Sequence, residues 1–150
     1  MTERYKPNTT VACVVHCQGR YLMVEEIIDG QLRYNQPAGH LEANESIIDA
    51  CVRECLEETG LTLSPDHLLA IYQFSANDCL AFVRYTFVVE LNEPLASAPI
   101  DTAINRTLWL SAAEINQRAD KLRSPLVMQS ITDHQNGKHF PLTLLNSRFL

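Results

Sequence analysis

The chain has 150 residues, which predicts a single domain over 1–150, and its hydrophobic content of 46% and charged content of 20% are typical of globular proteins. A formal charge of −6 without a basic run argues against nucleic acid as a partner, because phosphate repulsion would be uncompensated. The sequence has neither an apolar stretch near ~18 residues nor a secretory signal, so we expect a cytoplasmic protein with no membrane partner.

Three β-favouring runs open the chain and predict strands at 10–15, 21–26 and 32–35. Residues 36–39, Gln-Pro-Ala-Gly, then lead into a loop, where Gly39 permits a conformation or a close contact that a Cβ would prevent. A helix follows this loop. Asn44 or Ser46 can cap its start, and Gly60 is the expected residue at its end.

Further strands are expected in the second half of the chain, at 67–74, 80–91 and 107–110. Residues 92–106 lack periodicity and predict a long loop, of a kind that is often functional. Ser111 with Glu114 forms a capping box that opens a helix through Arg118, and Ser124-Pro125 begins a last helix. This order of elements predicts an α/β (α+β) fold of the α/β/α sandwich type.

Five cysteines occur in the chain, and in a reducing compartment we expect them as thiols in the core rather than as disulfides. Two Cys-x3-Cys pairs, Cys13 with Cys17 and Cys51 with Cys55, leave a four-cysteine zinc site open as an alternative. Both pairs lie in apolar strand or helix patterns, however, whereas zinc knuckles normally use turns.

Three glutamates share one face of the first predicted helix. At about 100° per residue, Glu54, Glu57 and Glu58 fall within an arc of about 100°. The neighbouring arc is apolar and suits packing on a sheet: Ile48, Cys51, Val52 and Cys55. Like charges at these spacings repel, so an ordinary surface gains nothing from them, whereas a hard divalent cation would turn the repulsion into a binding site.

The spacing across 39–61 carries a family resemblance. The pattern consists of Gly39, five residues, Glu45, seven residues and then Arg-Glu-Cys-Leu-Glu-Glu-Thr-Gly-Leu at 53–61. It is similar to the Nudix box, G-x5-E-x7-R-E-U-x-E-E-x-G-U, in which U is an apolar residue. Every fixed position matches, and Cys55 is the one unusual apolar residue. The resemblance implies a mixed sheet between helices, a hydrolase that acts on phosphoanhydrides, and Mg²⁺ as the cofactor with Mn²⁺ as a substitute.

The resemblance also implies roles for residues of the box. Glu54, Glu57 and Glu58 would be metal ligands, with the Ala38 carbonyl as an additional ligand, and Gly39 and Gly60 would serve the backbone geometry. Glu45 and Arg53 would hold the loop onto the helix. Direct phosphate contact by Arg53 is the alternative, because an Arg fork suits phosphate and carboxylate equally.

The catalytic base is left open between two positions. Asp101, in the loop predicted at 92–106, lies outside the helix, where many Nudix enzymes have this carboxylate. Glu57 or Glu58 acting from the helix is the competing assignment.

Substrate contacts are sought outside the three glutamates. His40 and Glu42 follow Gly39 in the loop, and Arg33 and Arg84 are candidates for phosphate oxygens. Three aromatic residues are candidate stacking surfaces for a heterocycle, although aromatic residues on strands are more often core: Tyr34, Phe74 and Trp109.

Segments 10–16, 35–42 and 122–127 resemble one phosphatase branch of the Nudix family. This resemblance implies hydrolysis of nucleoside tri- and diphosphates with release of orthophosphate. We separately expect the protein to be a monomer. It also implies action on 4-amino-2-methyl-5-hydroxymethylpyrimidine pyrophosphate or thiamine pyrophosphate. Two alternatives stay open: a pyrophosphohydrolase that forms a nucleoside monophosphate and pyrophosphate, and a non-catalytic module that senses a nucleotide.

Overall fold

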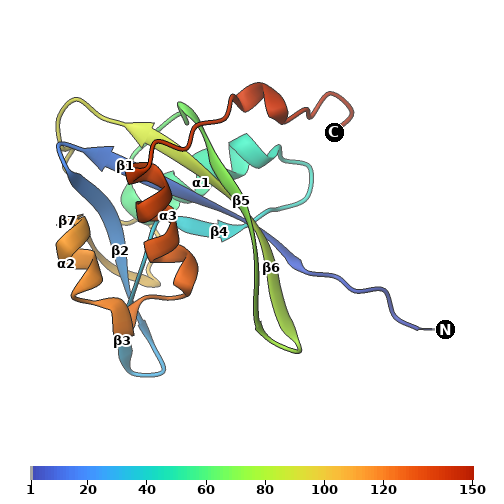
Figure 1. Ribbon diagram of the computed structural model, residues 1–150, viewed down its shortest axis with the longest axis horizontal. Helices are drawn as coiled ribbons and strands as arrows, with labels where there is room; N and C mark the ends of the chain where they lie inside the picture. The colour runs from blue at the N-terminus through green and yellow to red at the C-terminus, as the bar shows by residue number, and fades with distance from the viewer. Residues whose placement is uncertain (1) are drawn as a thin grey trace.

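The computed structural model describes residues 2–150 of the chain. A seven-stranded mixed sheet forms the centre of this structure (Figure 1). The strands are β1 (Asn8–Cys17), β2 (Arg20–Ile28), β3 (Gln31–Asn35), β4 (Ala38–His40), β5 (His67–Asn77), β6 (Leu80–Glu90) and β7 (Ile104–Ser111). Their order is β3-β2-β1-β6-β5, with β4 paired to β1 and β7 paired to β2. β1 and β6 run parallel, and the other pairs are antiparallel.

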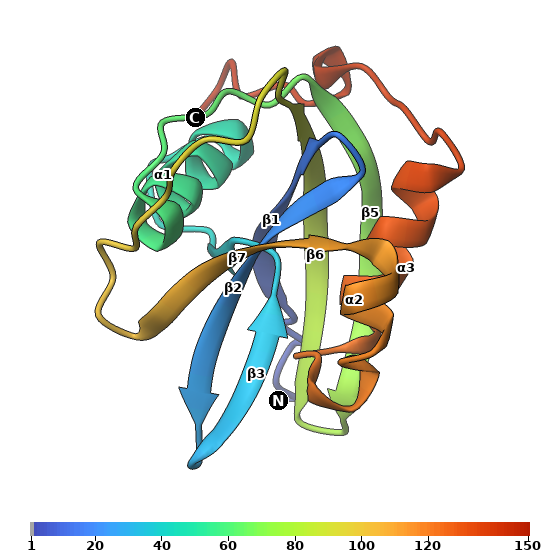
Figure 2. The same ribbon diagram turned by 90° about the vertical axis from the view of Figure 1, so that its left-hand side faces the viewer.

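Helices cover both faces of this sheet. They are α1 (Ile47–Thr59), α2 (Ala112–Asn116) and α3 (Pro125–Gln135), with short 3₁₀ helices η1 (Ala119–Lys121) and η2 (Leu142–Leu144). Figure 2 shows α1 on one side of the sheet and α2 with α3 on the other, so the predicted α/β/α sandwich is confirmed. None of the helices in residues 2–150 is long and apolar enough to cross a membrane.

Alternating side chains of β1 supply the centre of both cores. Val11, Cys13 and Val15 belong to the apolar cluster under α1, whereas Val14 belongs to the cluster under α3. This alternation follows from the two-residue period of a strand and explains the continuous apolar run in the sequence.

Cysteines of β1 and α1 are buried as free thiols, as predicted. The Sγ atoms of Cys13, Cys51 and Cys55 lie within 4.8 Å of one another, and Cys17 is not part of this group. The four cysteines considered for zinc therefore do not converge. Cys79 departs from the expected core position, because it is exposed on the β5–β6 hairpin.

Several predicted boundaries were wrong, and strands β1, β2 and β5 are longer than the ranges predicted for them. Residues 38–40 form strand β4 rather than a loop, because Val11 of β1 pairs with Gly39. A three-residue strand shows no periodicity, so its partner alone determines it. Strand β7 starts at Ile104, which shortens the predicted 92–106 loop, and α2 ends at Asn116 rather than Arg118.

Candidate active site

Both ends of α1 have the local chemistry that the sequence predicts. Ser46, rather than Asn44, is the N-cap, and its hydroxyl accepts a hydrogen bond of 3.0 Å from the Asp49 N–H. Gly60 has a left-handed backbone with φ of 74°, and a Cβ there would also overlap the Ala98 carbonyl oxygen. Glycine is therefore needed both for the helix end and for the close approach of the loop after β6.

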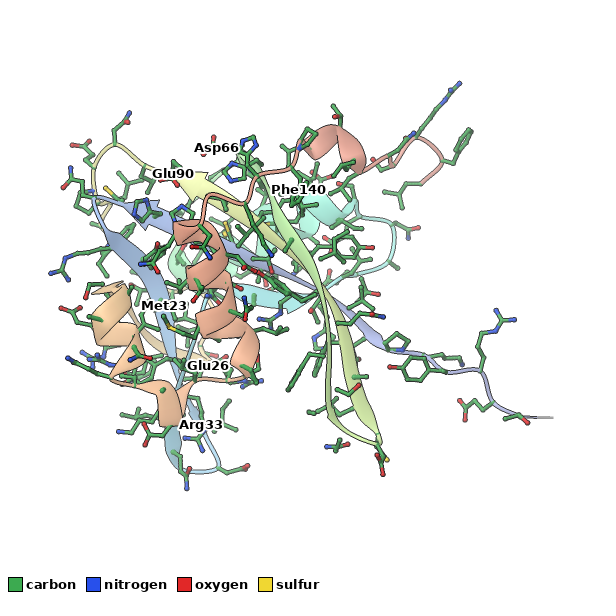
Figure 3. The ribbon with its side chains drawn as sticks, viewed as in Figure 1. Met23, Glu26, Arg33, Asp66, Glu90 and Phe140 are labelled. Carbon is green, nitrogen blue, oxygen red and sulfur yellow. The ribbon has the colours of Figure 1, made fainter. Side chains whose placement is uncertain are left out.

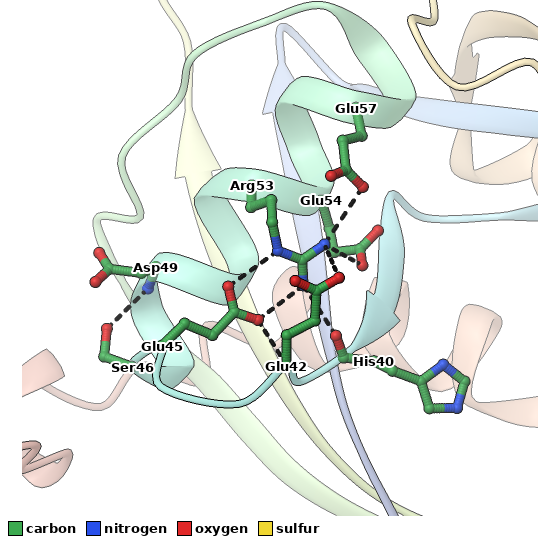
Figure 4. Close-up of polar contacts among 8 residues, drawn as sticks. All are labelled: His40, Glu42, Glu45, Ser46, Asp49, Arg53, Glu54 and Glu57. Atoms are coloured by element: carbon green, nitrogen blue, oxygen red, sulfur yellow. Dashed lines mark hydrogen bonds and ion pairs between the residues drawn. The ribbon is translucent and has the colours of Figure 1, made fainter. Parts of the chain in front are cut away.

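Arg53 ties three segments of the site together (Figure 4). Its Nε and Nη2 donate to the two carboxylate oxygens of Glu45 at 2.9 and 2.8 Å, and Nη2 also donates to the His40 carbonyl at 2.9 Å. The guanidinium thereby joins α1 to the preceding loop and to the end of β4, and it lowers the pKa of Glu45. Its Nη1 additionally contacts Glu54 at 2.8 Å and Glu57 at 3.3 Å.

The three glutamates of α1 differ in burial. Glu58 is 4% exposed and accepts a 2.7 Å hydrogen bond from the Ala38 N–H, whereas the Glu57 side chain is 45% exposed. Burial raises the pKa of Glu58 to about 9, because desolvation disfavours the carboxylate and the charges of neighbouring acidic groups add to this. Burial also raises the pKa of Glu54.

Gly39 lies directly against Glu54. A Cβ at this position would overlap the Glu54 carboxylate, so the close contact anticipated at Gly39 has a definite partner. β4 consequently lies against the carboxylates, and the Ala38 and Gly39 backbone borders them.

The loop after β6 brings Asp101 to the C-terminal end of α1. The Ile100 and Asp101 N–H groups donate to the Glu57 carbonyl at 2.9 and 2.8 Å, and the Ala98 N–H donates to the Thr59 carbonyl at 2.9 Å. The charge of Asp101 contributes to the raised pKa of Glu58. Asp101 therefore lies beside the carboxylate group without belonging to the helix.

This donor set fits a hard divalent cation. Within residues 2–150, the Glu58 side chain has one hydrogen bond, from Ala38, which leaves most of its acceptor capacity unused. Mg²⁺ and Mn²⁺ favour carboxylate and carbonyl oxygens. A nearby cation would also lower the raised pKa values of Glu54 and Glu58, since opposite charge favours the ionised form.

A cavity of about 330 Å³ also borders β4. Its floor includes His40, Thr10 and Arg84, which are register neighbours on β4, β1 and β6. The cavity is bounded by the start of α3 with Ser124 and by the β5–β6 hairpin with Phe74. Ala38 and Gly39 line this cavity and also contact the glutamates, so strand β4 separates the cavity from the α1 carboxylates by the thickness of one strand.

Residues 5–129 match the family model of the NUDIX domain. The chain belongs to the Nudix family. It is 46% identical to the phosphatase NudJ of Escherichia coli K12 over 141 residues, which cover 94% of this chain and 92% of that protein. NudJ of Shigella flexneri has the same identity and coverage. The resemblance of the flanking segments to a phosphatase branch is thus confirmed, and that branch is NudJ.

Solved structures agree with this assignment. A NUDIX hydrolase from Nitrosomonas europaea is 45% identical, has a TM-score of 0.85, and is aligned over 94% of this chain and 97% of its own. The NUDIX domain of Shewanella oneidensis NrtR, solved with ADP ribose, has a TM-score of 0.74 but 15% identity over 89% of each chain, so it shows the shared fold alone. The prediction of a Nudix hydrolase acting on phosphoanhydrides is confirmed by this family membership.

The predicted substrate residues of this Nudix protein do not all reach the cavity. His40 lines it, whereas Glu42 is exposed with its carboxylate 3.6 Å from Arg53 Nη1. Arg33, labelled in Figure 3, bonds to Gln31 on β3 and borders a separate hollow. Tyr34 is 5% exposed, which favours the core alternative over stacking on substrate.

The remaining candidate substrate residues also differ in whether they line the cavity. Trp109 packs against the core under α1 and donates to the Leu95 carbonyl at 3.2 Å, whereas Phe74 and Arg84 do line the cavity. Sequence reasoning missed five further lining residues with polar side chains: Thr10, Glu26, Asn35, Arg123 and Ser124. The Asn-Gln-Pro-Ala-Gly run at 35–39, adjacent to the box, was the available signal for Asn35.

Proposed function

We propose that this protein hydrolyses nucleoside tri- and diphosphates in a Mg²⁺-dependent reaction that releases orthophosphate. The observation that carries the proposal is the group of glutamates on α1, which adjoins a cavity of about 330 Å³ across β4. The 46% identity to the phosphatase NudJ supports orthophosphate as the product. We extend the proposal to 4-amino-2-methyl-5-hydroxymethylpyrimidine pyrophosphate and thiamine pyrophosphate, on the basis of the resemblance described above.

In this proposal Glu54, Glu57 and Glu58 hold the cation together with the Ala38 carbonyl. A bound Mg²⁺, or Mn²⁺ in its place, supplies positive charge against the phosphate oxygens. Arg53 and Glu45 keep α1 and the loop in position. Their side chains are already bonded to each other, which favours this role for Arg53 over direct phosphate contact.

The general base is assigned to a carboxylate of this site. Asp101 lies beside Glu58 on a loop that is bonded to α1, so it can approach a substrate from outside the helix. Glu57, which is half-exposed, and Glu58 compete for this role. For substrate contact, His40 is favoured by its place in the cavity, and Glu42 by its place at the loop that Arg53 holds.

Phosphorus NMR of the reaction with a nucleoside triphosphate tests the proposal. We expect conversion to the diphosphate and then to the monophosphate, with one orthophosphate formed at each step, and loss of the reaction in chelator. Pyrophosphate as the main product would replace the phosphatase by a pyrophosphohydrolase. Nucleotide binding without any turnover would identify a sensing module instead.

The proposal describes one Nudix domain over 1–150 that acts as a cytoplasmic monomer on small molecules. Size-exclusion chromatography with light scattering tests the monomer. A dimer would change the number of sites per particle but not the residues assigned to each site.

A further inference from the structure

Arg84 of β6 is an unusual arginine at the floor of the cavity. Its Nε and Nη1 are buried and have no hydrogen-bond partner within residues 2–150. Across the same residues, no carboxylate lies within the 4.0 Å that defines an ion pair with it. The hydroxyl of its neighbour Thr10 and the Oδ1 of Asn35, both in the cavity wall, also lack partners.

Two other arginines of this protein, half-buried Arg53 and exposed Arg106, are paired with carboxylates. Arg53 contacts the carboxylates of Glu42, Glu45, Glu54 and Glu57, and Arg106 makes two bonds to Glu25. A buried guanidinium without a counter-charge or hydrogen bonds is costly, because its donors lose water and gain nothing. Burial and the charge of Arg123 lower the pKa of Arg84 to about 10, so it remains a cation at neutral pH.

The surroundings of Arg84 indicate an anion as its missing partner. Arg123, the second cation of the cavity, is 3.2 Å from Glu26 and so is already paired. Arg84 therefore carries the uncompensated positive charge, in a chain whose formal charge is −6. A guanidinium fork matches the oxygens of a phosphate, which would satisfy both charge and donors.

The position of Arg84 along the cavity determines which phosphate it meets. The α1 glutamates border Ala38 and Gly39, whereas the tip of the β5–β6 hairpin supplies an apolar end with Phe74 and Phe82. These two rings stack with centroids 6.4 Å apart and planes 11° apart. Arg84 is a floor residue of this cavity, on the same strand as Phe82, and the charge of Glu58 acts on it.

We propose that Arg84 binds the phosphate next to the one held at the α1 glutamates, on the side that carries the organic group. The inference rests on the proposed function and names a substrate-binding residue for it. It predicts specificity for two or more linked phosphates, with the organic group placed against Phe74 and Phe82. Substrates with different organic groups would be accepted, because the Arg84 guanidinium contacts the phosphates that all of these substrates have in common.

Kinetics on two substrates test this assignment. Arg84→Met should lower kcat/KM by ~10²-fold or more for both a nucleoside triphosphate and inorganic triphosphate, since each loses a charged contact to phosphate. Arg84→Lys should recover part of the loss, because it restores the charge without the fork. Phe74→Ala should affect the nucleotide alone. Arg20→Met, at an exposed arginine that begins β2, is the matched control and should leave kcat/KM for both substrates unchanged.

A loss confined to the nucleotide would mean that Arg84 contacts the organic group, and unchanged kinetics would mean that it contacts no substrate. Either result overturns the inference.

Binding without turnover separates this inference from the proposed function. In chelator, inorganic pyrophosphate should raise the melting temperature of the wild type and of Glu57→Gln, but not that of Arg84→Met. Without pyrophosphate, Arg84→Met should melt higher than the wild type, because a half-buried guanidinium with two buried, unpaired nitrogens is removed, and this verifies folding. If the wild type hydrolyses nothing while this binding pattern holds, the proposed function fails and the anion site stands. Equal stabilisation of Arg84→Met by pyrophosphate would overturn the site.

Discussion

Glu25 on β2 and Glu58 on α1 are both nearly fully buried, at 2% and 4% exposure, but the two carboxylates are bonded differently. Glu25 accepts hydrogen bonds of 3.0 Å each from Arg106 Nε, Arg106 Nη2 and the Tyr34 hydroxyl, and a further bond from Asn105. Glu58 accepts one, from the Ala38 N–H. Two side chains of the same chemistry and burial therefore differ in whether the protein supplies their partners.

The pKa values move in opposite directions as a result. Arg106 lowers the pKa of Glu25 despite burial, whereas burial raises the pKa of Glu58 to about 9. Glu25 is thus a structural carboxylate whose charge is stabilised by its neighbours. Glu58 has a carboxylate whose charge needs a partner from outside the protein, and perturbed groups of this kind concentrate at functional sites.

Replacing each glutamate by glutamine should give opposite phenotypes. Glu58→Gln should lower kcat by ~10²-fold or more, through loss of an electrostatic contact at the site, and should raise the melting temperature in chelator. Glu25→Gln should leave kcat of the folded enzyme near the wild-type value. It should cost ~1.5–3 kcal/mol of stability, because bonds to a charged partner are lost. Phosphate release and thermal denaturation measure the two effects.

Glu57→Gln extends this test, because Glu57 is assigned to the same cation but is half-exposed. It should lose activity like Glu58→Gln and change the apo stability less. Full activity in either folded variant contradicts the assignment of the α1 glutamates. A Glu25→Gln enzyme that is stable but inactive would instead place Glu25 in the site.

The glutamate face was predictable from sequence because its geometry is local. Helical spacing alone places Glu54, Glu57 and Glu58 together, and the helix ends at Ser46 and Gly60 follow from cap chemistry. The structure adds their unequal burial, which depends on how closely β4 approaches α1 at Gly39.

The floor of the cavity was not predictable in this way. His40, Thr10 and Arg84 become neighbours through the register of three strands that are far apart in the sequence. A shift of one residue in either pairing would place Thr10 or Arg84 on the opposite face. Tyr34 illustrates the same limit, because an aromatic residue on a strand can lie in the core or at a ligand, and the register decides which.

Glu58 and Glu25 should make the free energy of unfolding depend on pH in opposite directions. Because the folded pKa of Glu58 is raised, the native state binds more protons than the unfolded one between roughly pH 4.3 and about 9, so apo stability falls as pH rises through this window. Glu25, with a lowered folded pKa, contributes stability above roughly pH 4.3 that is lost as pH falls.

Melting temperatures at pH 7 and 8 in chelator measure the Glu58 contribution. The melting temperature should decrease from pH 7 to pH 8 by more in the wild type than in Glu58→Gln. Comparing the two proteins cancels the contributions of histidine and thiol titrations, because both proteins share those groups. Saturating Mg²⁺ should remove the difference, since a cation favours the ionised carboxylate. Parallel pH dependence of the two proteins would mean that Glu58 is ionised without metal.

The smallest effect is expected at Glu54, which combines features of both glutamates. It is largely buried like Glu58, and burial raises its pKa, yet it has a charged partner in Arg53 Nη1 at 2.8 Å as Glu25 has in Arg106. Glu54→Gln should therefore change the apo melting temperature little, because relief of desolvation and repulsion offsets the lost ion pair.

The Mg²⁺ response isolates the part of Glu54 that resembles Glu58. Saturating Mg²⁺ should raise the wild-type melting temperature by mass action, and Glu54→Gln should reduce that rise because one ligand oxygen is lost. Glu3→Gln, which removes the same charge from the exposed N-terminal segment, is the control and should keep the full rise. If Glu54→Gln also keeps the full rise, Glu54 serves Arg53 as Glu25 serves Arg106, and the cation is held by Glu57 and Glu58 without it.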